Sequence, residues 1–116
     1  MARKDYILNR VEEIVCMVVN DSMDTLMPQL ERRVSPTELY EGRTNIPFAR
    51  KIARGMCFCI FHERFSLSYT AIAFRSGISR RNVMRSTSIM KNMPLDDKLI
   101  STVESAVNQR IREELF

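Results

Sequence analysis

The sequence predicts an all-α protein, a compact helical bundle of five to six helices in one domain that spans residues 1–116. Hydrophobic residues make up 45% of the 116-residue chain, which is enough for a modest single core. Only three glycines and four prolines interrupt it, and apolar residues recur every three or four positions instead of alternating. Serines and aspartates of the kind that cap helices precede several of these segments.

Residues 5–20 predict the first amphipathic helix. Its apolar stripe contains Ile7, Val11, Ile14, Val15 and Val18. Glu12 is expected on the opposite, solvent-facing side. Asp21 and Ser22 then have the form of a cap for a short further turn of helix that ends near Pro28.

A basic loop is expected at about residues 28–46, where the helical periodicity is lost. The run from Ser35 to Glu38 has the form of a capping box, which predicts a single helical turn. The loop contains Arg32, Arg33 and Arg43. Arg43 is the preferred phosphate or minor-groove contact of the three, because it belongs to an acid-poor part of the chain.

Pro47 suits the first turn of the next helix, which is expected to end near Glu63. Its apolar stripe contains Phe48, Ile52, Met56, Cys59 and Ile60. Arg50, Lys51 and Arg54 lie off this stripe and are expected to form an exposed basic flank. Because a helix N-terminus presents free amide groups, this flank suits a phosphate group.

Two short helices joined by a tight turn follow, a helix-turn-helix at about residues 68–91. Ser68 can cap the first helix and Ser79 the second, while Gly77 suits a helix end that needs a positive φ. An ordinary αα-hairpin has the same pattern, so the local sequence leaves both interpretations open. The second helix, Arg80 to about Asn92, has a buried seam of Val83, Thr87 and Met90.

The other side of this second helix carries Arg81, Asn82 and Arg85. Arginine can form two hydrogen bonds with guanine and asparagine two with adenine, so these side chains are the candidates for reading bases in the major groove. The ends of the helix suit contacts with the DNA backbone, through Ser79, Arg80 and Lys91. The complete set of candidate DNA-binding residues is Arg43, Arg50, Lys51, Arg54, Ser79, Arg80, Arg81, Asn82, Arg85, Ser86 and Lys91.

Asp96 can cap a last helix that closes the core. Its apolar stripe contains Leu99, Ile100, Val103, Val107, Ile111 and Leu115. Several acidic residues on this helix make it unsuited to face DNA.

The distribution of charge favours DNA binding over a plain hairpin. Residues 42–95 hold ten Lys and Arg against one Glu, whereas residues 1–41 and 96–116 are both acidic. A surface evolved only for solubility would mix the two signs. A basic middle between acidic flanks fits a surface that neutralises phosphates.

No metal, cofactor or catalytic site is expected. Cys16, Cys57 and Cys59 are odd in number, as expected in a reducing compartment, and His62 is the only histidine. We find no arrangement of nucleophile, base and acid, so an enzyme is not expected. The absence of a signal-peptide pattern and of a long apolar segment predicts a cytoplasmic, nucleoid-associated protein without membrane contact.

The order of the central motifs is similar to that of a known family. Along the chain stand Phe48–Arg54, Ser66–Ser68, Ala73–Phe74 and Val83. This arrangement resembles the C-terminal DNA-binding domain of the bacterial chromosomal replication initiator DnaA, over roughly residues 6–111. The resemblance implies a Trp-repressor-like helix-turn-helix, with Arg50 and Arg43 as matched basic contacts.

Two departures from that family limit what carries over. Its recognition helix begins Asp-His-Thr-Thr-Val, whereas residues 79–83 read Ser-Arg-Arg-Asn-Val. The chain is therefore not expected to share the family's DNA site. The phosphate-binding sequence G-x-x-x-x-G-K-[ST] is also absent, so no ATPase activity is expected.

The sequence thus predicts a stand-alone, sequence-specific double-stranded DNA-binding protein that regulates transcription or replication without ATPase activity. The alternative is a helical protein-interaction module that keeps the initiator-like fold but does not bind DNA. No small-molecule substrate is expected. The state of assembly, including a homodimer or a complex with a partner protein, is left open.

Overall fold

The structure is a computed structural model that describes residues 3–26, 33–42, 46–93 and 98–115. These residues form five helices and no strands: α1 (Arg3–Leu26), α2 (Phe48–Glu63), α3 (Tyr69–Ser76), α4 (Arg80–Asn92) and α5 (Lys98–Leu115). The predicted all-α class is confirmed. The expected Asp96 cap and the loop residue Arg43 lie outside the described residues.

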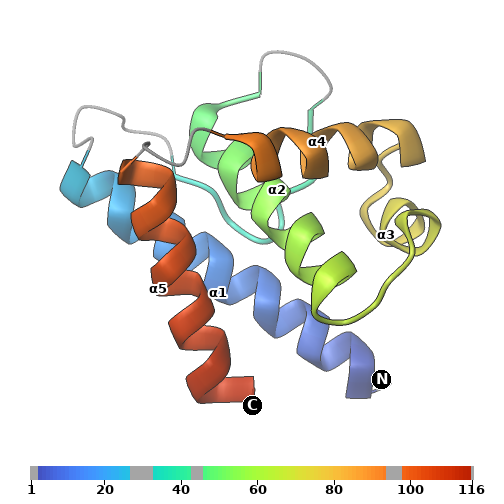
Figure 1. The fold of residues 1–116 in the computed structure, drawn as a ribbon, viewed down its shortest axis with the longest axis horizontal. Helices are drawn as coiled ribbons and strands as arrows, with labels where there is room; N and C mark the ends of the chain where they lie inside the picture. Colours follow the sequence, from blue (N-terminus) through green and yellow to red (C-terminus); the bar gives the residue numbers. More distant parts are fainter. Residues whose placement is uncertain (1–2, 27–32, 43–45, 94–97, 116) are drawn as a thin grey trace.

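Helix α2 is the centre of the bundle, with α1 packed on one side and α4 on the other (Figure 1). Its fully buried side chains include Ile52, Phe58 and Phe61. Phe48 was expected in this apolar stripe, but it begins the helix and remains 40% exposed. Helix α5 packs along α1, and its predicted stripe is confirmed at the buried residues Ile100, Val103, Val107 and Ile111.

Helix α1 differs from the expectation in two ways. It continues to Leu26 without a break at Asp21 and Ser22, and Met23, which follows them, is buried in the core. Packing of that side chain favours a continuous helix over a local cap, so the predicted separate turn is wrong. Glu12 is buried rather than solvent-facing, because it accepts hydrogen bonds from partners on other elements, described below.

Residues 33–42 cover one side of the core between α1 and α2. Val34 and Leu39 are buried, and the Asn20 side chain bonds both the N–H and the carbonyl of Val34. The backbone turns here through successive i→i+3 hydrogen bonds without becoming a helix, and the predicted capping box is wrong, because Glu38 bonds Arg50 instead.

The connection between α3 and α4 forms as predicted. The Ser68 hydroxyl accepts a hydrogen bond from the Ala71 N–H at 3.0 Å, and the Ser79 hydroxyl accepts one from the Asn82 N–H at 3.2 Å. Gly77 has φ +73° and ends α3. The three residues between the helices therefore hold α3 and α4 in a defined arrangement, with a side-chain cap at each helix start.

Candidate nucleic-acid interface

Helix α4 is fixed on α2 by its buried seam. Val83 and Thr87 are buried, and the Thr87 hydroxyl donates to the Val83 carbonyl at 2.9 Å, which satisfies it inside the core. Gly55 of α2 lies under this seam, where an added Cβ would come within 2.8 Å of Met90 Cε. The missing side chain lets the two helices approach closely. This packing determines which face of α4 points outwards.

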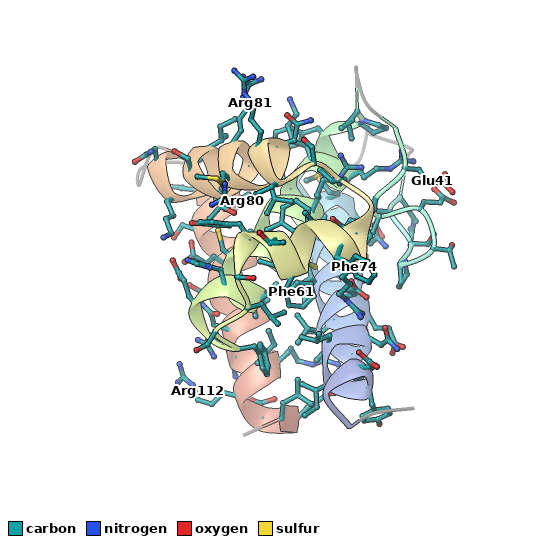
Figure 2. The ribbon with its side chains drawn as sticks, turned by 90° about the vertical axis from the view of Figure 1, so that its right-hand side faces the viewer. Glu41, Phe61, Phe74, Arg80, Arg81 and Arg112 are labelled. Carbon is teal, nitrogen blue, oxygen red and sulfur yellow. The ribbon has the colours of Figure 1, made fainter. Side chains whose placement is uncertain are left out.

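The outward face of α4 is rich in arginine. Arg80, Arg81, Asn82 and Arg85 are all exposed, and α4 itself contains no acidic residue. Within the part of the chain that the structure describes, none of these three arginines forms an ion pair. Figure 2 shows Arg81 projecting away from the body of the molecule. We call Arg80, Arg81, Asn82 and Arg85 the α4 basic face.

The α4 basic face is electrostatically unfavourable for the isolated protein. Arg80 and Arg81 occupy the first turn of α4, where the helix dipole is positive and acidic residues are preferred. Arg81 and Arg85 are four positions apart, so their like charges repel on one helix face. Each effect costs a few tenths of a kcal/mol. A bound anion would reverse both.

Arg54 does not belong to an exposed basic flank, and that prediction is wrong. Its side chain is only 6% exposed, with Nε donating to the Leu39 carbonyl at 3.1 Å and Nη2 to the Glu41 carbonyl at 2.7 Å. Burial lowers the pKa of this guanidinium, and the nearby Arg50 lowers it further. Arg54 holds the 33–42 segment against α2, and its hydrogen bonds leave it no access to a phosphate.

Arg50 is also engaged within the protein. Its Nη1 donates to the Glu41 carbonyl at 3.0 Å, and Nη2 lies 3.5 Å from a Glu38 oxygen. The side chain is 18% exposed. Lys51 is therefore the exposed base of the expected α2 flank.

Lys91, at the other end of α4, pairs with Glu63 at 2.9 Å. The hydrogen bond that Lys91 donates to this carboxylate, together with the negative charge of Glu63, raises the pKa of Lys91. Both side chains are about half exposed, so the pair can open to a phosphate at little cost. Ser86 is half-buried, and the Ser79 hydroxyl is occupied as a cap.

Sequence reasoning missed a buried ionic cluster that connects α1, α3 and the 33–42 segment. Arg75 Nη2 donates to Glu12 at 2.8 Å and to Asn9 at 2.6 Å, while the Tyr40 hydroxyl donates to the same Glu12 carboxylate. The Arg75 guanidinium also lies 5.7 Å from the centre of the Phe61 ring. Arg75 was counted in the basic middle segment, but its charge is neutralised inside the protein.

Two sequence signals could have indicated this cluster. Glu12 directly follows Val11 and precedes Ile14, so it borders a wide apolar stripe. Arg75 is the only base of α3. Neither signal identifies the partner, because the two residues are 63 positions apart.

The described residues contain no group of three or more His, Cys, Asp or Glu placed to hold a metal ion. Burial raises the pKa of the Cys16 thiol to about 12 and that of Cys59 to about 11, and it also raises the pKa of Cys57. His62 stacks on Tyr69 with ring centres 4.2 Å apart. None of the helices described here is long and apolar enough to cross a membrane.

Comparison of the chain with protein-family models, curated proteins and solved structures found no match. Inferences about its function therefore rest on its own residues and on the resemblance of its motif order described in the sequence analysis.

Proposed function

We propose that the chain is a non-enzymatic, sequence-specific double-stranded DNA-binding protein. In this proposal α3, the turn at Gly77 and α4 act as a helix-turn-helix, and α4 enters the major groove. The observation that supports it most is the α4 basic face, with three exposed arginines that have no acidic partner among the described residues.

The residues of α4 divide into two roles in this proposal. Arg81, Asn82 and Arg85 read base edges in this proposal, because all three are exposed on α4 and lie off its buried seam. Arg80 and the exposed Lys51 of α2 bind phosphates, and Lys91 joins them when it leaves Glu63. Ser79 contributes by fixing the first turn of the helix.

The resemblance to the DNA-binding domain of the replication initiator DnaA supports a role in replication or transcription. The different residues at positions 79–82 imply a DNA site that is not the initiator's. A nucleoid-associated protein in the cytoplasm fits this role.

Salt dependence of DNA binding tests the proposal directly. Arg80, Lys51 and Lys91 give about three phosphate contacts, so the logarithm of the association constant should fall with the logarithm of salt at a slope of about −3. Fluorescence anisotropy with a labelled duplex measures this slope. A slope near zero, or no binding at low salt, would refute DNA binding.

Selection from random duplex DNA tests the sequence specificity. Arg81→Ala should cost about 1–3 kcal/mol on the selected site and relax the preference at one base pair. Lys51→Ala is the matched control, since it should weaken the selected and random duplexes alike. Equal losses for both variants on both duplexes would remove Arg81 from the base-reading set.

A protein-interaction module is the second candidate function, and one observation favours it. Phe74 of α3 is 92% exposed, and Ile89 of α4 is 49% exposed. Exposed apolar side chains of this size often contact partners. In this case Phe74→Ser should abolish partner binding, and the wild-type chain should show no affinity for DNA at low salt.

A further inference from the structure

Two large apolar side chains of α4 are exposed, although the other exposed residues of this helix are polar or charged. Met84 is 40% exposed and Ile89 is 49% exposed. Single exposed apolar residues are common on protein surfaces, so exposure alone assigns a function to neither of them. Their positions around the helix axis, relative to the residues proposed to read bases, distinguish the two.

Ile89 continues the stripe that begins with Asn82 and Arg85. The three residues stand at positions i, i+3 and i+7, which is the spacing of side chains on one face of a helix. With about 3.6 residues per turn, Ile89 lies within about 40° of each of the other two around the helix axis. A helix face that presents Asn82 and Arg85 to base edges therefore presents Ile89 to the same groove.

Met84 lies on a different edge of α4. It is about 100° or more from Asn82 and Arg85 around the helix axis, but only about 40° from Arg80, which the proposed function assigns to a phosphate. Met84 is therefore a matched comparison for Ile89, because it has similar exposure on the same helix and lies outside the base-reading stripe.

The rise along α4 determines how far Ile89 reaches along the groove. Ile89 is four residues beyond Arg85, a distance of about 6 Å at about 1.5 Å per residue. Successive bases of B-DNA are about 3.4 Å apart, so Ile89 reaches about two base pairs beyond the pair that Arg85 contacts. Recognition helices that lie along the groove read bases over about eight residues, which is the length of the stretch from 82 to 89.

The chemistry of an isoleucine in this place favours one base. Thymine is the only base that presents an apolar group, its C5-methyl, in the major groove. The branched Cβ of isoleucine leaves one strongly preferred χ1 rotamer in a helix, so little side-chain freedom is lost in a contact. A cytosine in the same place would bury its amino group against an apolar side chain, and α4 has no acidic residue to accept a hydrogen bond from it.

We infer that Ile89 is a specificity-determining residue, whose side chain contacts the methyl group of a thymine about two base pairs from the pair that Arg85 contacts. The inference rests on the proposed function, in which α4 lies in the major groove. It assigns to Ile89 a contact that hydrogen-bonding residues cannot supply.

Replacement of this thymine by deoxyuridine tests the contact, because it removes only the methyl group and preserves base pairing. The probe is the duplex selected from random DNA, and Arg85→Ala locates the reference base pair as the one at which preference is relaxed. Fluorescence anisotropy should show that the replacement lowers wild-type affinity about fourfold, the effect of one buried methyl group. A selected site without thymine at this place, or equal wild-type affinity for the two duplexes, would overturn the inference and leave DNA binding by α4 intact.

Variants at the two exposed apolar positions show whether Ile89 makes the contact. Ile89→Ala should bind the thymine duplex about fourfold more weakly than the wild type and bind both duplexes equally. Met84→Ala should retain the wild-type ratio of the two affinities. If the methyl group acted through duplex shape alone, the ratio would persist in Ile89→Ala. That result, or equal loss of the ratio in Met84→Ala, would overturn the inference.

Absence of binding to either duplex at low salt is a separate outcome. It would refute the proposed DNA binding and the thymine contact together. It would also favour the protein-interaction module, in which the exposed Ile89 would contact a protein partner.

Discussion

Arg81→Glu should make the protein more stable and weaken its specific DNA binding. Arg81 lies in the first turn of α4, at the positive end of the helix dipole, and four positions before Arg85. A glutamate at position 81 interacts favourably with the positive end of the helix dipole, where Arg81 interacts unfavourably. The glutamate also attracts Arg85, which Arg81 repels. Together these changes should raise the free energy of unfolding by about 1 kcal/mol.

Two measurements on the same samples check this prediction. Thermal unfolding followed by circular dichroism should show Tm rising by about 3–6 °C for a domain of this size. Fluorescence anisotropy should show affinity for the selected duplex falling at least about tenfold, because one bidentate base contact is lost and a repulsive charge is added. Stability and affinity should therefore change in opposite directions.

Arg112→Glu is the matched control, since it makes the same change in net charge. Arg112 is exposed in the last turn of α5, far from Arg81 in Figure 2, at a helix end where a cation is favourable. This variant should lose about 0.5 kcal/mol of stability and keep its specific DNA affinity within about twofold. Lower stability of Arg81→Glu, or equal loss of DNA affinity in both variants, would refute the reasoning.

Three further predictions concern the interior. Gly55→Ala should change the free energy of unfolding by less than about 1 kcal/mol, because the gain in helix propensity offsets a small shift of the flexible Met90 side chain. Gly55→Leu should displace α4 and lower the free energy of unfolding by about 1–3 kcal/mol. Chemical denaturation measures both changes. Arg54→Met should cost about 2 kcal/mol, because the Leu39 carbonyl loses its side-chain donor and the Glu41 carbonyl keeps only the hydrogen bond from Arg50; DNA affinity should be unchanged at low temperature, the reverse of Lys51→Ala. Burial raises the pKa of Cys59 to about 11 and that of Cys16 to about 12, against 9.0 for an exposed thiol. The contribution of these two thiols to the free energy of unfolding should therefore be constant below pH 9 and fall as the pH rises towards 12. Melting curves at pH 8 and pH 10.5 that coincide would contradict this.

Local signals in the sequence predicted the helices well, because caps and turns depend on neighbouring residues. Ser68, Gly77 and Ser79 each have the predicted conformation, and the bounds of α3 and α4 follow from them. The seam at Val83 and Thr87 is buried as expected. These features involve residues at most four positions apart, which is the distance over which a helix repeats its pattern.

The roles of individual charges could not be predicted in the same way. Arg54 is buried because two carbonyls of the preceding segment accept its hydrogen bonds, and Glu12 is buried because Arg75 reaches it from another helix. Helical periodicity assigned Glu12 to solvent, although a charged side chain can enter a core once it is paired and hydrogen-bonded. That compensation depends on tertiary contacts between distant positions.

The structure changes how the positive charge of the middle segment should be counted. Arg54, Arg75 and Arg50 are used inside the fold, and Lys91 is paired at the surface. The described bases of this segment that remain exposed without an ion pair are Lys51, Arg64, Arg80, Arg81 and Arg85. Three of these five belong to α4, and two occupy its first turn, where their charge opposes folding. The unpaired bases are thus concentrated on α4 at an electrostatic cost to folding, and binding of an anion to this helix is the physical process that would offset it.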